Sequence, residues 1–305
     1  MSFLLGIDIG GTKTAIGLYG CDLAPIDTVS FATEPMLGAD SLVKRIGDTC
    51  REISRRNGFD GSADFVGVAC PGPLDLKSGR IVYIPTMGFK DVPIRDMLEA
   101  ELGTKVYLEN DANCAALAEA RAGAGKGFDN VVYVTVSTGV GGGIVINGRL
   151  YDGGAGNAGE IGHICVERGG IPCGCGKKGC LEKYASGTAI AEIASQKLGT
   201  QIDAKTVFAR TRGGDSICCE VVKQAADRLG FALGAVWQIV DPDIIVLGGS
   251  VTKDFDVLGP LLMSALSDYV QSVDTRELRV VKATLGGSQG MLGAVYNAAD
   301  LHLKG

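Results

Sequence analysis

The sequence predicts an α/β fold in two domains, and three observations support this prediction. The chain has 305 residues, about twice the length of a typical domain. Apolar segments with the spacing of strands alternate with segments that have the spacing of helices, as in other α/β proteins. An apolar strand, a glycine-rich turn and a second apolar strand occur at residues 3–19 and again at 130–147. This repetition indicates a weak internal duplication.

The first half of the chain opens with a predicted β-hairpin, because apolar runs of β character flank a glycine-rich turn. A long helix follows, since apolar residues recur on one helical side from Leu42 to Ile53. The strands expected in this half are 3–9, 14–19, 64–70 and 105–108, and the expected helices are 39–57, 93–102 and 112–123.

The second half repeats the opening pattern, with strands at 130–136 and 144–147 around a turn at 137–143. Residues 151–182 are rich in glycine and cysteine and have little periodicity, and such long loops are usually functional. The boundary between the domains is expected near residues 111–113. The other expected elements are helices at 185–197, 203–210, 216–240, 260–269 and 290–303 and strands at 243–247 and 278–283.

The composition excludes several classes of protein. The formal net charge is −6, without the basic stripe that nucleic-acid-binding proteins carry. No segment reaches the roughly 18 consecutive apolar residues of a membrane span, and the first apolar run ends at Asp8, too early for a signal peptide. We therefore expect a cytoplasmic protein without nucleic-acid or membrane partners. In that reducing compartment, metal binding or burial explains the ten cysteines better than disulfides.

The first glycine-rich turn has the composition of a phosphate-binding loop. Asp8 precedes Gly10, Gly11, Thr12 and Lys13. Backbone N–H groups beside glycines can converge on an anion, and the threonine hydroxyl is a further donor. The carboxylate ends a buried strand, where it is costly without a partner such as a metal-bound phosphate or a hydrogen-bond network. A tight hairpin turn is the alternative.

A second turn, with Thr138, Gly139 and Gly141, also follows a predicted strand. Either turn alone could be an ordinary turn that binds no ligand, but the presence of two favours a phosphate clamp with one loop from each domain. A third pair, Gly248 and Gly249, follows the strand at 243–247, and there we expect the backbone to approach a base or ribose closely.

Asp111 is the candidate general base. It follows a predicted strand in the sequence Glu109-Asn110-Asp111. Phosphoryl transfer to a hydroxyl needs positioning, charge neutralisation and a carboxylate that accepts the hydroxyl proton. Asp111 could instead cap the helix that follows, and one residue can have both roles.

His163, Cys173, Cys175 and Cys180 have the residue types and spacing of a zinc site. Glycines between them would let the chain wrap around a metal. Four protein ligands would close the coordination shell, so the zinc is expected to be structural. Three buried thiols are the alternative, which two intervening lysines disfavour. The other cysteines show no ligand spacing and are expected to be buried or incidental.

These motifs together resemble the ROK family of bacterial sugar kinases, its glucokinases most of all, over nearly the whole chain. The histidine and cysteine signature is highly specific, whereas the glycine loops alone are weak. The matching segments are 8–13, Cys-Pro-Gly-Pro at 70–73, Glu-Asn-Asp-Ala-Asn at 109–113, Ser-Thr-Gly-Val-Gly-Gly-Gly at 137–143, Gly-Glu-Ile-Gly-His at 159–163, the cysteines at 173–180, Leu-Glu-Lys-Tyr-Ala-Ser-Gly at 181–187 and Asp-Pro-Asp-Ile-Ile-Val-Leu-Gly-Gly at 241–249.

The resemblance implies a two-domain, actin-like ATPase fold of the ribonuclease H type, with the active site in a cleft between the domains. The last helix would return to the first domain. A small first domain would then comprise residues 1–111 and 290–305 with the first phosphate loop. A larger second domain, residues 112–289, would hold the second phosphate loop, the zinc site and the adenosine loop. A homodimer is the expectation for the family.

The resemblance also implies roles for individual residues. Asp111 matches the catalytic base, and Asp8 would order Mg²⁺ or its waters. His163 would bind zinc through one ring nitrogen and face the sugar with the other. Residues 10–13 and 138–141 match the phosphate loops that bind ATP, and 248–249 match the adenosine loop. The positions that hold the sugar are matched by Gly72, Asn110, Asp111, Glu160, His163 and Glu182.

The predicted function is ATP-dependent phosphorylation of a hexose at its 6-hydroxyl. Glu160 favours glucose, since some N-acetylmannosamine kinases lack this residue. The segments at 134–140 and 204–210 look more like N-acetylmannosamine kinases. Kinases of mannose, fructose, allose and N-acetylglucosamine share the same core motifs, and polyphosphate is not excluded as donor.

Two other classes of function are weighed against a kinase. The family includes sugar-responsive repressors with an N-terminal helix-turn-helix segment. Since seven residues precede Asp8 in this sequence, we do not expect such a segment here. A catalytically inactive sugar sensor is expected to lack Asp111 or a phosphate loop, and this sequence has all of them.

Overall fold

The computed structural model describes residues 2–271 and 277–304, which form two compact units. The first comprises Met1–Glu119, Asp152–Gly156 and Leu285–Gly305, and the second Ala120–Tyr151 and Asn157–Thr284. The ends of the predicted first domain, Met1 and Gly305, and residues 272–276 of the predicted second lie outside the described residues. Within the described ranges, no helix combines the length and apolar character that crossing a bilayer requires.

A five-stranded sheet in the order β3-β2-β1-β4-β8 is the centre of the first unit. β1 and β2 form the predicted antiparallel hairpin, while β4 runs parallel to β1 and β8 parallel to β4. The carboxyl ends of β1, β4 and β8 therefore lie along one edge. The elements are β1 (Leu4–Ile9), β2 (Lys13–Tyr19), β3 (Pro25–Ala32), β4 (Val66–Cys70), β8 (Val106–Asn110), α1 (Gly38–Arg56), α2 (Ile94–Leu102), α3 (Asp111–Ala122) and α9 (Gln289–His302).

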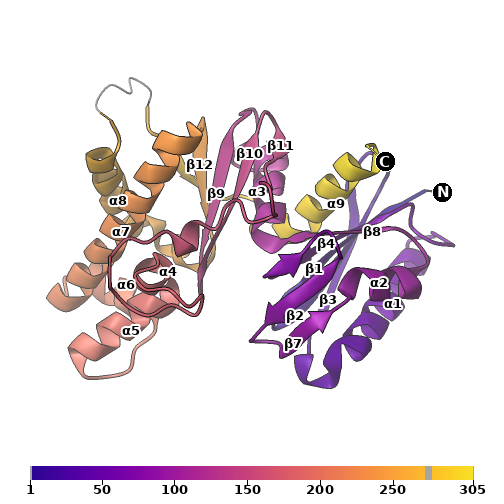
Figure 1. Ribbon diagram of the computed structural model, residues 1–305, viewed down its shortest axis with the longest axis horizontal. Coiled ribbons are helices and arrows are strands. Elements are labelled where there is room, and N and C mark those ends of the chain that lie inside the picture. Colours follow the sequence, from indigo (N-terminus) through magenta and orange to yellow (C-terminus); the bar gives the residue numbers. More distant parts are fainter. Residues whose placement is uncertain (1, 272–276, 305) are drawn as a thin grey trace. The chain divides into compact units, whose positions relative to one another are not determined.

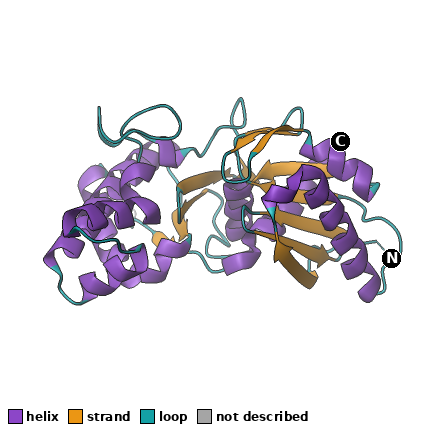
Figure 2. Ribbon diagram, turned by 90° about the horizontal axis from the view of Figure 1, so that it is seen from below, coloured by secondary structure: helices purple, strands orange, loops and turns teal. Residues whose placement is uncertain are grey.

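Helices cover both faces of this sheet (Figure 2). Ile7, Val68 and Leu108 pack against α1 and α2 on one face. On the other face α9, yellow in Figure 1, lies against β1, β4 and β8, as the resemblance implies. The helix α9 approaches β4 so closely that a Cβ at Gly67 would clash with the carbonyl oxygen of Ala294.

The second unit repeats the same strand plan, with the order β11-β10-β9-β12-β13. An antiparallel pair, β9 and β10, is followed by the parallel strands β12 and β13, as the repeated sequence pattern predicts. Its core lies between the sheet and the helices α4 to α8. The elements are β9 (Val131–Val136), β10 (Val140–Ile146), β11 (Arg149–Leu150), β12 (Ile244–Gly248), β13 (Val280–Lys282), α4 (Glu182–Ala185), α5 (Gly187–Leu198), α6 (Ala204–Arg212), α7 (Ser216–Val240) and α8 (Phe255–Tyr269).

Several elements were not predicted. β3 and a separate three-stranded sheet in the order β5-β6-β7 consist largely of exposed or alternating polar residues, which give a weak strand signal. These additional elements are β5 (Leu74–Asp75), β6 (Arg80–Ile84), β7 (Phe89–Val92) and the 3₁₀ helices η1 (Pro35–Leu37), η2 (Ile161–His163), η3 (Ser250–Asp254) and η4 (Gly286–Ser288).

Several boundaries differ from the predictions, and the helix expected at 260–269 begins earlier, at Phe255. The expected turn at 137–143 is shorter, because β10 begins at Val140 and its glycines pair with β9. The expected helix at 185–197 is divided at Ser186, whose side chain caps α5. The units change after Glu119 rather than near 111–113, because Cys114 in α3 packs with Ala69 and Ala294 of the first unit.

Candidate functional site

The carboxyl edge of the first sheet brings together the acidic residues that the sequence singled out. Asp8 and Asn110 lie near the ends of β1 and β8, with β4 between them. Burial, followed by the nearby charge of Asp111, raises the pKa of Asp8 to about 6, and Lys13 partly opposes this. A Cβ at Gly290 would clash with the Asp8 carboxylate, so the first turn of α9 lies directly against it. The positive end of a helix dipole favours a negative charge there.

Buried threonine hydroxyls support the backbone of the first glycine-rich turn. Gly10 N donates to Lys13 O at 3.0 Å, and Gly10 O accepts from Thr33 Oγ1 at 2.6 Å. Because that bond uses the Thr33 hydroxyl hydrogen, Thr14 Oγ1, 2.9 Å away, is the donor to Thr33. Thr33 is 2% exposed, whereas Thr12 and Lys13 are exposed. The turn thus presents its polar tip outward, and Thr33 is a supporting residue that the sequence analysis missed.

Asn110, rather than Asp111, caps α3. Its Oδ1 accepts from Ala112 N at 2.9 Å and Asn113 N at 3.3 Å. Asp111 is the exposed first residue of the helix, and its Oδ1 also accepts from Ala112 N at 2.9 Å. Gly72 lies beside this junction, since a Cβ there would be 3.5 Å from Asn110 Nδ2. The alternative role predicted for Asp111 is therefore carried mainly by its neighbour.

In the second unit, Glu182 lies against the second glycine-rich turn. Its Oε2 accepts from Val140 N at 3.1 Å, and a Cβ at Gly139 would clash with the same oxygen. This glycine is thus required for the approach of a carboxylate from within the chain. The sugar contact predicted for Glu182 stays a prediction.

Gly248 and Gly249 also have neighbours within the chain. A Cβ at Gly248 would clash with the Tyr133 hydroxyl, and one at Gly249 with the carbonyl oxygen of Val136. The close backbone approach predicted here is thus made to β9 itself. Ser250 follows, and its Oγ lies 3.0 Å from Ser137 Oγ, so this loop and the second phosphate-loop candidate are joined.

A pocket of about 560 Å³ opens beside these two loops. Ala191, Ile202 and Ala204 give it an apolar wall. The first residues of α5 form part of its lining, and a helix N-terminus favours bound phosphate. The remaining polar lining comes from Ser137, Thr138, Thr188, Glu192, Gln201, Asp203 and Ser250. Its volume is in the range of small-molecule sites, about 300–1,000 Å³.

The four predicted metal ligands gather in the second unit. One ligand atom from each of His163, Cys173, Cys175 and Cys180 lies within 4.8 Å of all the others. The Sγ atoms of Cys175 and Cys180 are 3.6 Å apart, and Cys173 Sγ is 3.7 Å from His163 Nδ1. These separations fit a tetrahedral zinc site, whose S–S edges are about 3.8 Å for Zn–S bonds of about 2.3 Å. A hydrogen bond from the Lys177 backbone lowers the pKa of the Cys175 thiol, which favours the ligating thiolate, whereas burial and the neighbouring thiols raise the pKa of Cys180.

His163 connects this cluster to Glu160. With Nδ1 toward the thiols, its Nε2 lies 3.8 Å from Glu160 Oε2. Both side chains are exposed enough to meet a ligand. They are held in place because η2 packs on β10, where a Cβ at Gly162 would clash with the Val140 carbonyl oxygen.

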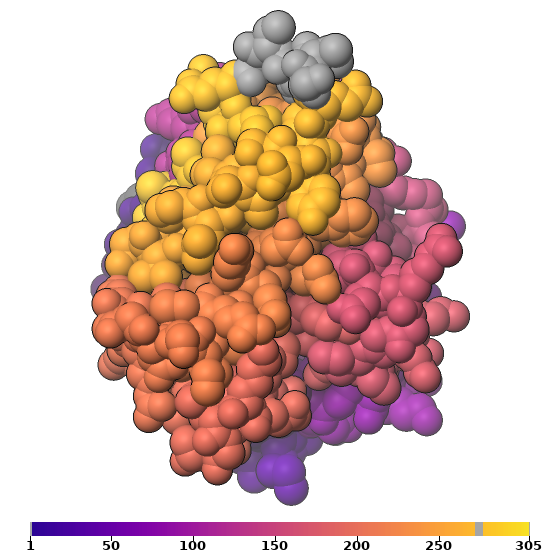
Figure 3. All heavy atoms as spheres, turned by 90° about the vertical axis from the view of Figure 1, so that its left-hand side faces the viewer, coloured from indigo at the N-terminus to yellow at the C-terminus, as the bar shows by residue number. Residues whose placement is uncertain are grey.

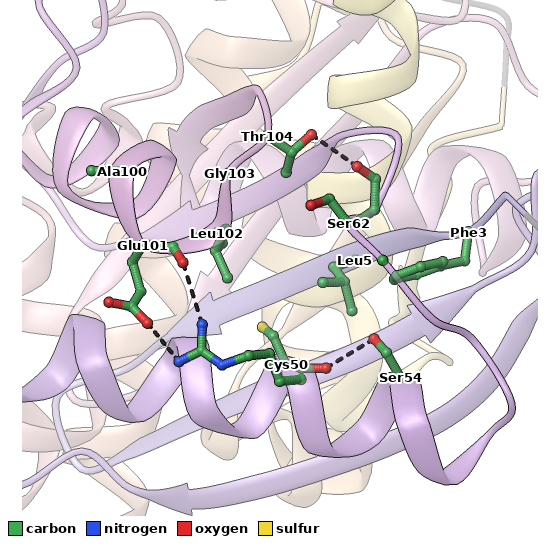
Figure 4. Close-up of a pocket in the computed structure, with 13 residues that line it drawn as sticks. Phe3, Leu5, Cys50, Ser54, Ser62, Ala100, Glu101, Leu102, Gly103 and Thr104 are labelled. Atoms are coloured by element: carbon green, nitrogen blue, oxygen red, sulfur yellow. Dashed lines mark hydrogen bonds and ion pairs between the residues drawn. The ribbon is translucent and has the colours of Figure 1, made fainter.

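The first unit has another pocket, of about 310 Å³, at the opposite edge of its sheet (Figure 4). It is lined by Phe3 and Leu5 at the start of β1 and by the segments before β4 and β8. Arg51 at its side is already paired with Glu101 at 2.6 Å. Ligands of open α/β sheets bind at the carboxyl ends of the strands, so we leave this pocket out of the site.

Comparison with known proteins agrees with these observations. The family model described as ROK family matches residues 4–300. Glucokinase from Thermotoga maritima is 34% identical over 307 residues, 95% of each chain. The crystal structure of ROK hexokinase from Thermus thermophilus has a TM-score of 0.91 at 35% identity, covering 99% of this chain and 100% of that one. The ROK family glucokinase from Streptomyces griseus, in complex with glucose and AMPPNP, has a TM-score of 0.80 at 32% identity and full coverage of both chains. These likenesses confirm the predicted α/β fold of two-domain, actin-like ATPases.

Proposed function

The chain belongs to the ROK family, and from this we propose that it is an ATP-dependent hexose kinase that phosphorylates the 6-hydroxyl of glucose. The observation that carries the proposal is the carboxyl edge of the first sheet. There the carboxylates of Asp8 and Asp111 lie beside a glycine-rich turn. Both Asp111 and Lys13 are close enough to Asp8 for their charges to act on it. Phosphoryl transfer requires such a combination of charge neutralisation and a base.

Asp111 is the base in this proposal. Its exposure at the start of α3 supports this role, because a substrate hydroxyl can reach it. It would accept the proton of the sugar 6-hydroxyl as that oxygen bonds to the γ-phosphorus and the bond to the ADP oxygen breaks. Asn110 and Gly72 would position the sugar beside it.

Asp8 fits a Mg²⁺ site. Burial raises the pKa of its carboxyl because the ionised form is poorly solvated, and a bound cation would stabilise that form. When bound, Mg²⁺ neutralises phosphate charge. Asp8 would hold it directly or through water. The turn at 10–13, including Gly11, would donate backbone N–H groups to phosphate oxygens.

ATP is the proposed donor, and the pocket of about 560 Å³ supports it. Its apolar wall suits a nucleoside, and Thr138 at its edge belongs to the second glycine-rich turn. Polyphosphate has no nucleoside that could occupy this apolar wall. We therefore favour ATP over polyphosphate.

Zinc has a structural role in the proposal. The tetrahedral fit and the thiolate-favouring environment of Cys175 support it. Four protein ligands leave no open position for substrate. By fixing His163 through Nδ1, the metal would hold the Nε2 side of the ring and Glu160 in place for the sugar.

Glucose is the preferred sugar in the proposal, since Glu160 and His163 lie together. Two segments resemble N-acetylmannosamine kinases. The segment 204–210 lies in α6, and residue 204 lines the pocket assigned to ATP, whereas 134–140 runs from the end of β9 through the turn to the first residue of β10. The first segment bears on the nucleotide site, whereas Val140 of the second contacts Glu182 and η2 and so bears on the sugar site as well.

The test is ADP release by zinc-replete protein with Mg-ATP and glucose, mannose, fructose, allose, N-acetylglucosamine or N-acetylmannosamine. We expect kcat/KM to be highest for glucose. A different dominant sugar would correct the substrate, and no release with any sugar would refute the kinase in favour of a sugar sensor. In a parallel arm, polyphosphate replaces ATP, and faster glucose 6-phosphate formation would overturn the choice of donor.

We further propose a homodimer in the cytoplasm. All ten cysteines are free thiols, which supports a reducing compartment. On the second unit, α7 and α8 contribute to the face shown in Figure 3. Phe231 and Ile239 of α7 are exposed apolar side chains of the kind that subunit interfaces cover. Sedimentation equilibrium tests the dimer, and a monomer at micromolar concentration would refute it.

A further inference from the structure

Glu109, at the end of β8, has a carboxylate in an unusual place. It is 3% exposed and lies in one row of the sheet with Ala69 and Asp8. Burial raises the pKa of its carboxyl, against the opposing effect of hydrogen bonds from Asn113 and Asn110. A buried charge is costly unless hydrogen bonds offset the lost solvation, so the contacts of this carboxylate need an explanation.

Both hydrogen bonds of this carboxylate are made to the junction between β8 and α3. Glu109 Oε1 accepts from Asn110 N at 2.8 Å and from Asn113 Nδ2 at 2.9 Å. Asn113 is 2% exposed, and its Oδ1 has no partner among the described residues. This amide therefore gives up one hydrogen bond while it donates to Glu109.

The junction bonds form a closed set. Asn110 Oδ1 accepts from the backbone N–H groups of Ala112 and Asn113, while Glu109 holds the backbone N–H of Asn110 and the side chain of Asn113. With Oδ1 directed at the helix, Asn110 presents Nδ2 on the side of Gly72. The side chain that the proposed function assigns to the sugar is thus oriented as a donor to a hydroxyl oxygen.

We propose that Glu109 is a positioning residue, which orients Asn110 and the start of α3 for sugar binding. This inference rests on the proposed function. Glu109 is buried beneath the junction, so its effect on the sugar would pass through Asn110. The nucleotide pocket is formed by residues of the second unit, and binding there would not depend on Glu109.

The kinetic test compares three variants of Glu109 with one control. Glu109→Ala removes both hydrogen bonds, and we expect the KM for glucose to rise about 10-fold to 100-fold, the range for bonds to a charged group. The KM for ATP should stay within about twofold. Glu109→Gln keeps a neutral acceptor oxygen, so its KM for glucose should rise less than that of Glu109→Ala. Glu109→Asp keeps the charge on a shorter side chain that cannot reach both donors, and its KM for glucose should also rise.

Tyr107→Phe is the matched control. Tyr107 lies on the same strand and bonds His302 Nδ1 through its hydroxyl at 3.0 Å, so its loss weakens β8 without touching the junction. If Tyr107→Phe raises the KM for glucose as much as Glu109→Ala, the role of Glu109 is merely structural. Should Glu109→Ala fail to fold, an unchanged KM in Glu109→Asp would overturn the proposal.

A second measurement separates this inference from the proposed function. Amide hydrogen exchange at Asn110 should be at least about tenfold faster in Glu109→Asp than in Tyr107→Phe, because only the first loosens the acceptor of that N–H. Equal exchange in the two variants would refute the positioning role even if the protein phosphorylates glucose. Faster exchange in a protein that phosphorylates no sugar would support the junction geometry and refute the kinase.

Discussion

Replacement of Asp8 by asparagine should stabilise the protein while it removes activity. The Asp8 carboxyl has its pKa raised from 3.8 to about 6 by burial and by Asp111. A carboxylate that ionises less readily in the folded than in the unfolded chain lowers stability wherever it is ionised. Asparagine has a similar shape and carries no charge, so Asp8→Asn removes this cost.

The magnitude follows from the difference between the two pKa values. About two pH units correspond to about 3 kcal/mol, which is the upper limit of the gain. Burial of the asparagine amide returns part of it, so we expect a gain of about 1–2 kcal/mol above pH 7. For a chain of 305 residues that corresponds to a rise in Tm of about 2–3 °C.

The direction of the Asp8 pKa shift determines how the stability of the protein changes with pH. Between pH 3.8 and about 6, the folded chain binds the Asp8 proton and the unfolded chain has released it. The stability of the unchanged protein therefore falls as pH rises through this window, whereas asparagine does not titrate. The advantage of Asp8→Asn should be complete at pH 8 and nearly absent at pH 4.

The assay is scanning calorimetry at pH 8, 6 and 4 without Mg-ATP. Asp60→Asn, at an exposed aspartate, controls for the removal of one negative charge. Fluorescence of Trp237, buried in the second unit, checks that the variant is natively folded there. If the Tm of Asp8→Asn is at or below that of the unchanged protein at pH 8, or if its advantage persists at pH 4, the ionised Asp8 carboxylate does not destabilise the fold.

Three further predictions concern the proposed machinery. Asp111→Asn should lower kcat at least about 100-fold, because general bases contribute that much, with glucose affinity by calorimetry nearly intact; retention of more than about a tenth of the rate contradicts the assignment. Cys175→Ser should lower the zinc content by atomic emission together with Tm, whereas Cys165→Ser, at an exposed thiol outside the ligand set, should change neither; unchanged zinc in Cys175→Ser refutes the four-ligand site. Thr33→Val removes the hydroxyl that donates to Gly10 O and should raise the KM for ATP several-fold at constant KM for glucose; an equal rise in both would show a general loss of structure.

The strongly periodic elements could be predicted from the sequence, because their apolar residues form the cores. The helix expected at 216–240 is α7 with the same bounds, and the repeated hairpin pattern corresponds to two sheets of the same strand order. The β5-β6-β7 sheet could not be predicted, since its strands are short and largely exposed.

Glycine shows the limit of sequence analysis at the site. A glycine signals that something approaches the backbone closely, but its partner can be a ligand or the chain itself. At Gly139 the partner is Glu182, and at Gly248 it is Tyr133. Thr33 gave no signal at all, because a threonine distant in sequence from Gly10 becomes its hydrogen-bond donor only when β3 pairs with β2.

The reaction that we propose for this protein is the transfer of a phosphoryl group from ATP to the 6-hydroxyl of a hexose. The most direct measurement is product formation from glucose and from 6-deoxyglucose with Mg-ATP, followed by ³¹P and ¹³C NMR. We expect glucose 6-phosphate, with carbon–phosphorus coupling at C6, and no sugar phosphate from 6-deoxyglucose. Phosphate on another carbon, or equal ADP release with both sugars, would contradict it.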